Sequence, residues 1–273
     1  MKRNYHFKDA LAETLLIPLY MRAKDYRNGD YSILNDQWAD KLVNIVNFDF
    51  SIYNHAKMNE MGCIVRTWYF DHIIRQYIAS RRHPVVINIG CGLDARAQRI
   101  GDDGKTIFYE VDLPEVIDLR NDIFPAASND RYVKGSILDT DWMEIIRNEN
   151  PEGQFILVIE GVLMFFTEET VKTFLSNLAK HFPGSEVWFD ICGNLMYKQH
   201  ITPSSLKQHE AEIRFGLSNG KTIEQWIPSL SLIKQVHYMK FFRNRWGIFL
   251  GHFIGRIPKL CYQFSSMVGY RIN

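Results

Sequence analysis

Two glycines and one acidic residue are spaced along the chain as a nucleoside-binding turn requires. A β-branched run at 85–89 leads into Gly90-Cys91-Gly92, and Asp112 stands 22 positions after Gly90. Glycines let the backbone turn sharply and approach a ligand closely. A carboxylate at this spacing accepts two hydrogen bonds from a ribose diol. The pattern predicts a nucleoside site at the end of a strand, and a tight turn without a ligand is the alternative.

Asp94 bears on which nucleoside would bind. It stands near the expected start of the helix that follows the glycines. A phosphate at a helix start needs bare amides, and an aspartate there would repel it. A sulfonium nucleoside such as S-adenosylmethionine has no phosphate and carries a positive charge. Asp94 therefore favours S-adenosylmethionine, and a nicotinamide-dependent oxidoreductase is the alternative.

Glu160 follows a further apolar run at 155–159. In parallel sheets the ligand crevice lies at the carboxyl ends of the strands, so Glu160 is expected beside the same site. We expect it to bind the cationic end of the cofactor or to orient Arg66. A purely structural ion pair is the other interpretation.

The composition is that of a globular protein without a strong charge. The chain has 273 residues, 46% of them hydrophobic, and a formal net charge of +1. This balance gives no general attraction to nucleic acid, and none is expected as a partner. The four cysteines form no CxxC pair, so no metal site is expected. Scattered cysteines and the absence of a signal-peptide pattern predict a cytoplasmic protein.

Short β-branched runs alternate with segments of helical periodicity through the middle of the chain. This alternation implies right-handed crossovers and a doubly wound parallel sheet. The expected strands are 85–90, 106–111, 132–135, 155–159, 186–191, 231–239 and 266–272. The expected helices are 10–21, 36–46, 61–79, 93–100, 113–123, 141–148, 168–181 and 244–261, with Thr167 as the N-cap of the helix at 168–181.

We expect a single domain in four parts. These are a helical N-terminal extension (1–82), a cofactor-binding core (83–192), a lid insertion (193–230), and C-terminal strands with a helix (231–273). The lid is inferred because a long segment interrupts the alternation before the next strand. The apolar stretch 246–257 is shorter than the ~20 residues of a membrane span, so we expect a buried helix. A position on a membrane surface is the alternative for this stretch.

The order and spacing of several blocks resemble the leucine carboxyl methyltransferase family, and within it the bacterial polyketide O-methyltransferases of the tetracenomycin type. The resemblance runs from Thr14 to about Trp226. The blocks are TLLIPLYMRAKDY, RTWYFD, VVINIGCGLDARAQRI, EVDLPEVIDLR, GSILDTDW and EGVLMFF. The resemblance implies an α/β class I methyltransferase fold, Rossmann-like, with a seven-stranded sheet containing one antiparallel strand, an N-terminal helical extension and a lid. It also implies S-adenosylmethionine as the cofactor.

The resemblance further implies roles for single residues. Arg66 would bind the methionine carboxylate of the cofactor, since guanidinium pairs with carboxylate through two parallel hydrogen bonds. Gly90 would lie against the methionine part, and Asp112 would bind the ribose. Ser136-Ile137 stands where the family often has Asp-Leu beside the adenine. Glu160 matches the glutamate of the family's EG motif.

This chain departs from the family at two further places. Phe165-Phe166 replaces the more usual Tyr-Leu, and Arg120 stands where many members carry lysine. Arg22 and Lys24 fall in the N-terminal basic motif. They are expected to reach the cofactor carboxylate or the substrate, or else to be solvated.

The implied reaction is methyl transfer to an oxygen of a small molecule, such as a polyketide. A carboxylate acceptor is already ionised near pH 7 and needs no base, whereas a hydroxyl needs one. No residue is assigned as catalytic. The weak candidates are His200 and His209 as bases and Tyr69, Tyr197 and Arg214 as acceptor contacts. Arg214 is preferred among the contacts because it would neutralise a substrate carboxylate. A methyltransferase-like protein that binds the nucleoside without turnover is a third hypothesis, and the sequence does not predict the oligomeric state.

Overall fold

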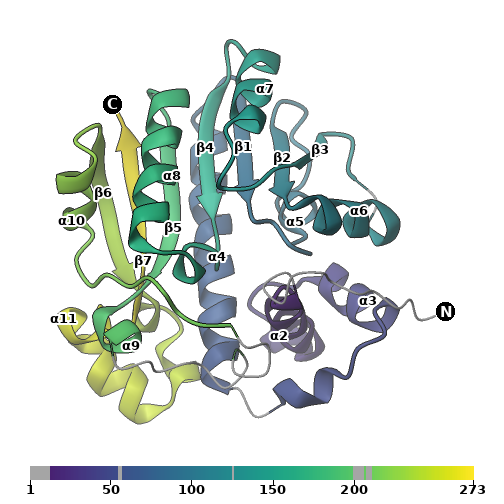
Figure 1. Cartoon of the computed structure of the whole chain (residues 1–273). Coiled ribbons are helices and arrows are strands. Elements are labelled where there is room, and N and C mark those ends of the chain that lie inside the picture. The colour runs from purple at the N-terminus through teal and green to yellow at the C-terminus, as the bar shows by residue number, and fades with distance from the viewer. Residues whose placement is uncertain (1–12, 55–56, 125, 199–205, 207–210) are drawn as a thin grey trace.

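A computed structural model describes residues 13–54, 57–124, 126–198, 206 and 211–273. Its centre is a seven-stranded sheet in the order β3-β2-β1-β4-β5-β7-β6 (Figure 1). Strands β1 to β5 are parallel, and β7 is antiparallel to both of its neighbours. The strands are β1 (Pro84–Ile89), β2 (Ile107–Asp112), β3 (Asp130–Lys134), β4 (Gln154–Ile159), β5 (Glu186–Cys192), β6 (Leu230–His237) and β7 (Ser265–Ile272). The predicted seven-stranded sheet with one antiparallel strand is confirmed.

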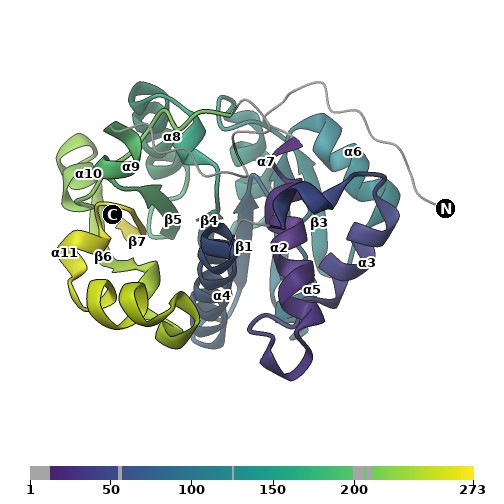
Figure 2. The ribbon, with the colours of Figure 1, turned by 90° about the horizontal axis from the view of Figure 1, so that it is seen from below.

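Helices cover both faces of this sheet, as buried parallel strands require. The helices are α2 (Leu16–Arg27), α3 (Gln37–Ile45), α4 (Lys57–Ala79), α5 (Arg96–Ile100), α6 (Pro114–Ile123), α7 (Asp141–Glu149), α8 (Glu168–His181), α9 (Asn194–Lys198), α10 (Lys221–Trp226) and α11 (Pro258–Cys261). Apolar residues of α4 pack on one face, and those of α7, α8 and α10 pack on the other (Figure 2). Thr167 caps α8 as predicted, since its Oγ1 accepts a hydrogen bond from Thr170 N.

Helices α2 and α3 form a separate layer at the edge of the sheet where the parallel strands end (Figure 1). They share a second apolar core with Leu119, Ile123 and Phe124 from α6 and its end. Asp36 begins α3, because its Oδ1 accepts a hydrogen bond from Ala39 N at 3.0 Å. The N-terminal layer therefore closes one side of the crevice that the strand ends leave open.

The prediction of one buried helix at 244–261 is wrong. The structure has 3₁₀ turns at Arg243–Trp246 and Ile254–Arg256, a π-helical turn at Ile248–Phe253 and the short helix α11. Gly247 has φ +79°, which takes the chain out of the helical region. A side chain at Gly251 would meet the Arg243 carbonyl oxygen at 1.9 Å, so the turns pack more closely than a regular helix allows. Several apolar side chains of this stretch are exposed, as described below.

The segment expected to be a lid has two different parts. Its second half packs on the main core through Phe215 and through Ile223 and Ile227 of α10 and its end. Its first half holds α9 and Leu206, and Leu206 lies against the N-terminal layer. His200 and His209 lie outside the described residues, as does the start of the helix predicted at 10–21. The lid at 193–230 therefore stays a prediction.

No described helix combines the length and the apolar character that crossing a membrane requires.

Replacement of Leu157 tests the packing of the central strand β4. Its side chain is fully buried in the main core. Leu157→Ala is expected to lower the free energy of unfolding by about 2–5 kcal/mol, because it removes buried methyl groups and leaves a cavity. Urea denaturation measures this change. The matched control is Leu138→Ala, at a position that is 67% exposed, and it should cost no more than ~0.5 kcal/mol. Equal losses for the two variants would contradict this account of the core.

Candidate active site

A cavity of about 370 Å³ opens where strands β1, β2, β4 and β5 end. A cavity of this size suits a small ligand. The predicted cofactor residues all line it, namely Arg66, Gly90, Asp112, Ser136, Ile137 and Glu160. The structure thus brings together side chains from α4 and from the loops after four strands. Their individual roles toward a ligand stay predictions.

The glycine turn after β1 is shaped for close approach of a ligand. Gly90 and Gly92 have φ +68° and +49°, in the left-handed region that favours glycine. A side chain at Gly90 would lie 2.3 Å from Cγ2 of Val162, so no larger residue fits. Arg120 holds this turn from below, since its Nη1 donates to the carbonyl oxygens of Gly92 and Asp94 at 2.8 and 2.9 Å. Arg120 is therefore a support for the turn and does not line the cavity.

Asp112 ends β2 with its carboxylate at the cavity. Its Oδ2 accepts a hydrogen bond from Gly92 N and its Oδ1 accepts one from Leu113 N, both at 2.7 Å. Burial raises the pKa of Asp112, and the two amides oppose that shift. Each carboxylate oxygen still has a lone pair for another donor. This arrangement fits a carboxylate that holds both the glycine turn and a ribose diol.

Ser136 and Ile137 follow β3 at the cavity wall. Ser136 Oγ accepts a hydrogen bond from Leu138 N, and its carbonyl oxygen accepts one from Nε1 of Trp142. The serine hydroxyl keeps its own proton for donation, which is the capacity that contact with an adenine edge requires.

Three protein donors bind the carboxylate of Glu160. Its Oε1 accepts from Nε of Arg66 at 3.1 Å and from Oγ1 of Thr67 at 2.6 Å, and its Oε2 accepts from Nη2 of Arg96. Burial would raise the pKa of Glu160, but Arg96 and Arg66 outweigh it and the net shift is downward. Of the two roles considered for Glu160, orienting Arg66 is the one that this geometry supports.

Two of the three guanidinium nitrogens of Arg66 are paired with carboxylates, and the third is not. Its Nη1 donates to Oδ2 of Asp190 at 2.9 Å, in addition to the bond from Nε to Glu160. No described group accepts from Nη2, which lies beside Gly161, where an added Cβ would be 2.8 Å away. Because Arg66 lines the cavity, Nη2 is available to a ligand carboxylate.

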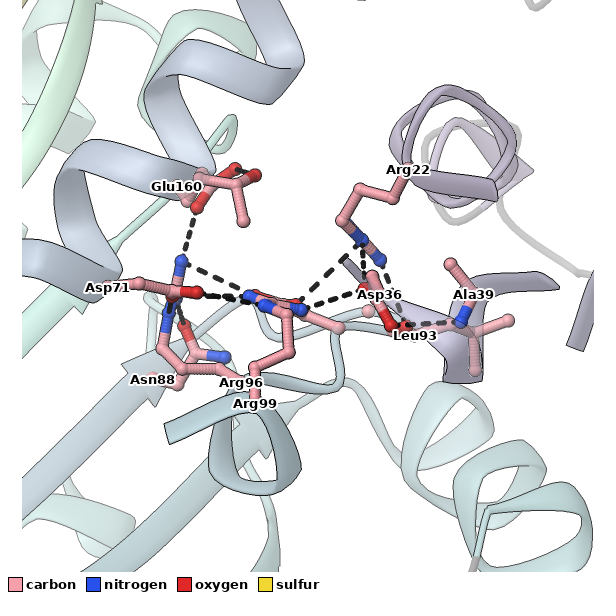
Figure 3. A network of polar contacts seen from close by, with 12 residues as sticks. Arg22, Asp36, Ala39, Asp71, Asn88, Leu93, Arg96, Arg99 and Glu160 are labelled. Carbon is pink, nitrogen blue, oxygen red and sulfur yellow. Dashed lines mark hydrogen bonds and ion pairs between the residues drawn. The ribbon is translucent and has the colours of Figure 1, made fainter. Parts of the chain in front are cut away.

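A buried ionic network extends from this site to the N-terminal layer (Figure 3). Arg96 pairs with Asp71 of α4 at 3.0 Å and donates to Oδ1 of Asn88 at 2.6 Å. Arg99 pairs with Asp71, Asp36 and Asp94 at 2.8, 2.9 and 2.6 Å.

Asp94 is part of this network. Burial would raise the pKa of Asp94, but Arg99, Arg96 and Arg22 outweigh it and hold the pKa below its usual range. These arginines compensate its charge, so the argument that Asp94 would repel a phosphate loses its force. The helix after the turn also begins only at Arg96 and is five residues long. The choice between the two nucleosides must therefore rest on other observations.

The sequence interpretation gave no role to four residues that hold the site together, namely Asp71, Arg96, Arg99 and Asp190. Asp190 carried a usable signal, because it lies close to the end of a parallel strand, as Glu160 follows one. The partners of Asp71 are 25 and 28 residues away along the chain, and no local pattern indicates them.

Most of the candidates for acceptor contact lie away from the cavity. Tyr69 is buried in the core beside Trp188, Arg214 is exposed, and neither they nor Tyr197 line the cavity. Lys24 pairs with Glu60 at 2.6 Å and is also not in the lining. Arg22 does line the cavity, and its Nε pairs with Asp36 at 3.1 Å.

The lining of the cavity is mostly apolar. Among the described residues, its charged members are two arginines and four carboxylates, with no lysine or histidine. Two of these carboxylates, Asp94 and Glu160, also pair with arginines just behind the lining, so their charge is compensated. No described cluster of His, Cys, Asp or Glu could hold a metal ion.

The sheet order, with β7 antiparallel to its neighbours, gives the fold class predicted from the sequence, that of the class I methyltransferases. The model of the leucine carboxyl methyltransferase family matches residues 16–179, and the chain belongs to that family. The predicted family is thereby confirmed.

Relatives and solved structures agree with this assignment. The chain is 27% identical over 223 residues to the tetracenomycin polyketide synthesis O-methyltransferase TcmP of Streptomyces glaucescens, covering 82% of this chain and 81% of that protein. It is 27% identical to a putative S-adenosyl-L-methionine-dependent methyltransferase of Mycolicibacterium paratuberculosis, over 60% of this chain and 68% of the other. A DUF574 family protein of Streptomyces avermitilis has the same fold, with a TM-score of 0.54 at 14% identity, covering 93% and 97% of the two chains.

The cofactor is S-adenosylmethionine, and the protein is a methyltransferase that depends on it. The residues present fit that molecule. Arg66 has Nη2 free for a methionine carboxylate, Gly90 leaves no room for a side chain, and Asp112 retains acceptor capacity for a ribose. The nicotinamide alternative is not favoured.

Asp112→Ala tests the ribose contact. The variant is expected to weaken binding of S-adenosylhomocysteine by about 1.5–3 kcal/mol, the scale of a hydrogen bond to a charged group. Isothermal titration calorimetry measures the affinity. The control is Asp118→Ala, which removes an exposed carboxylate that pairs with Lys134 and should leave binding unchanged. Equal affinities for Asp112→Ala and the unmodified protein would show that the ribose is held elsewhere.

Glu110 lies behind the site and makes the stability depend on pH. It accepts a hydrogen bond from Asn88 at 2.7 Å and has no exposed surface. Burial raises its pKa to about 8, although Arg120 opposes the shift from 4.0 Å. An unfolded glutamate titrates near ~4.3. Between these values the unfolded chain releases the proton and the folded chain keeps it, so stability is lost as the pH rises.

Glu110→Gln removes this titration. The melting temperature of the unmodified protein is therefore expected to fall relative to that of Glu110→Gln as the pH rises from about 5 to 8. Differential scanning calorimetry across this range measures the difference. Glu152→Gln, at a side chain 83% exposed, should instead run parallel to the unmodified protein. Parallel curves for Glu110→Gln as well would contradict the raised pKa.

Proposed function

We propose that the protein transfers the methyl group of S-adenosylmethionine to a carboxylate oxygen of a small, largely apolar acid. The observation that carries the proposal is the lining of the cavity, which is mostly apolar and, among described residues, holds no histidine or lysine. Ile17 and Pro18 of α2 and Trp246 and Leu250 of the C-terminal turns also line the cavity, far in sequence from the cofactor residues. These apolar walls offer an acceptor apolar contact rather than charge.

The ionisable groups of the lining are poor bases. The Tyr238 hydroxyl donates to Oδ2 of Asp190 at 3.1 Å, and burial raises its pKa well above the usual range. Burial likewise raises the pKa of the Cys63, Cys91 and Cys192 thiols. Glu160 is committed to Arg66 and Arg96. Among the described residues of the lining, an acceptor that must lose a proton finds no histidine or lysine to take it, whereas a carboxylate arrives already ionised.

The bound cofactor supplies a methyl group on a positively charged sulfur. The chain's own contribution is then to orient and to exclude water. Arg66 would hold the methionine carboxylate of the cofactor and Asp112 its ribose, and the turn at Gly90 would allow close approach. Positioning of two reactants in this way is worth up to roughly 7–11 kcal/mol of the barrier. The apolar walls would also exclude water from the acceptor oxygen.

The comparisons support transfer to oxygen. The family takes its name from carboxyl methylation, and TcmP is named an O-methyltransferase of polyketide synthesis. A hydroxyl acceptor is the second candidate, because His200 and His209 lie outside the described residues. The third hypothesis, a protein that binds the nucleoside without turnover, is separated from these two by the turnover assay below.

The pH dependence of turnover separates these possibilities. Aromatic and aliphatic carboxylic acids and the matching phenols are each incubated with S-adenosylmethionine and the protein. With an acid, kcat/KM is expected to stay level from about pH 6 to 8 and to fall below the pKa of the acceptor, near ~4–5. Methyl ester formation, followed by mass spectrometry, provides the rate.

Turnover of phenols alone, with a rate that rises through neutral pH, would overturn the carboxylate proposal. Cofactor binding without turnover of any acceptor in the panel would count for the non-catalytic hypothesis.

A further inference from the structure

Residues 238–261, here called the rim segment, concentrate positive charge. They include Lys240, Arg243, Arg245, Arg256 and Lys259 and contain no aspartate or glutamate. Because the whole chain has a net charge of +1, the remainder carries −4. Four of the five basic side chains are exposed and Arg243 is partly exposed. None of the five pairs with a carboxylate among the described residues, whereas exposed lysines elsewhere, such as Lys134 and Lys172, do.

The rim segment also exposes apolar side chains. Eleven large apolar side chains are strongly exposed among the described residues, and five of them fall within these 24 residues. The five are Ile248, Phe249, Phe253, Ile257 and Leu260, exposed by 77, 68, 64, 51 and 37%. Such a cluster is unusual on a surface in contact with water alone and marks a place of contact.

The irregular backbone separates an inner from an outer face. Trp246 and Leu250 line the cavity, whereas Phe249 and Phe253 are exposed. The rings of Phe249 and Phe253 lie 6.4 Å apart, so they form one outward surface. Figure 1 shows the segment, in yellow-green, at the same end of the molecule as α2 and α9.

The neighbouring surface continues this character. The side chain of Tyr31, 81% exposed, lies close by, since its carbonyl oxygen accepts a hydrogen bond from Arg245 at 2.9 Å. Met58 is 63% exposed and lines the cavity from the start of α4. The exposed apolar surface therefore reaches the cavity lining itself.

We infer that the rim segment docks the protein on the surface of an anionic lipid bilayer. Protruding aromatic and aliphatic side chains enter the headgroup region, and unpaired lysines and arginines attract acidic headgroups. A protein partner would have to supply acidic groups matched to each cation, whereas a lipid surface adapts to them. On the basis of the proposed function, docking would place the cavity next to the bilayer, so that an apolar acid passes from lipid to the site without crossing water.

Flotation with vesicles tests the inference on the full chain. The vesicles are phosphatidylcholine alone, or phosphatidylcholine with about one-third phosphatidylglycerol. The protein is expected to float with the anionic vesicles and not with the neutral ones, and to be released by high salt. Failure to float with anionic vesicles at low salt would overturn the inference.

Variants locate the contact. Phe249→Ser and Phe253→Ser should each lower the partition coefficient by about tenfold, and Arg256→Gln and Lys259→Gln by about fivefold each. The controls are Ile145→Ser and Lys180→Gln, at exposed positions on α7 and α8, which lie outside the rim segment. Equal losses in variants and controls would show that the rim segment is not the contact.

Two further measurements separate bilayer docking from self-association and from catalysis. If the protein does not float, its oligomeric state is measured by analytical ultracentrifugation. A dimer that Phe249→Ser dissociates would show that a second copy of the chain covers this face instead. Binding of S-adenosylhomocysteine and turnover of a water-soluble acid should be unchanged in the Phe249 and Phe253 variants. Membrane docking can therefore fail while methyl transfer persists, and methyl transfer can fail while docking persists. Each proposal is thus tested separately.

Discussion

The site depends on pairing buried charges. Four arginines (22, 66, 96 and 99) and five carboxylates (Asp36, Asp71, Asp94, Glu160 and Asp190) form one connected network with little contact to water. Removing one partner of a buried ion pair leaves the other charge buried and unpaired, which typically lowers the free energy of unfolding by about 3–5 kcal/mol. The network joins α2, α3, α4 and the ends of β1, β4 and β5, so the cavity exists only when the N-terminal layer is docked on the sheet.

Much of the core was predictable because its signals are local. Runs of β-branched residues followed by glycine or an acid predict buried parallel strands, and all seven expected strands are present within a few residues of their predicted bounds. The turn at Gly90 and the acid at Asp112 follow from backbone geometry and the spacing of one crossover. The family resemblance added Arg66, which no local pattern indicates, since its partners lie 94 and 124 residues away.

The errors come from side-chain arrangements in space that the sequence does not show. Asp94 looked repulsive to phosphate because residue types alone do not show that its neighbours Arg96 and Arg99 pair with its carboxylate. The stretch at 244–261 has enough apolar residues for a helix, but Gly247 takes a positive φ and the turns are drawn together at Gly251. Tyr69 and Arg214 were only weak candidates for acceptor contact, with a structural role preferred for each, and one is packed in the core while the other faces water.

Asp36 has a double role that decides where the molecule can open. Its carboxylate fixes the first turn of α3 and also binds Arg22 and Arg99. Fraying of that helix would therefore uncover two guanidinium groups in a dry interior, so the N-terminal layer behaves as a rigid wall. The C-terminal turns Arg243–Trp246 and Ile248–Phe253, which also contribute to the lining, have no such ion pair with any described residue.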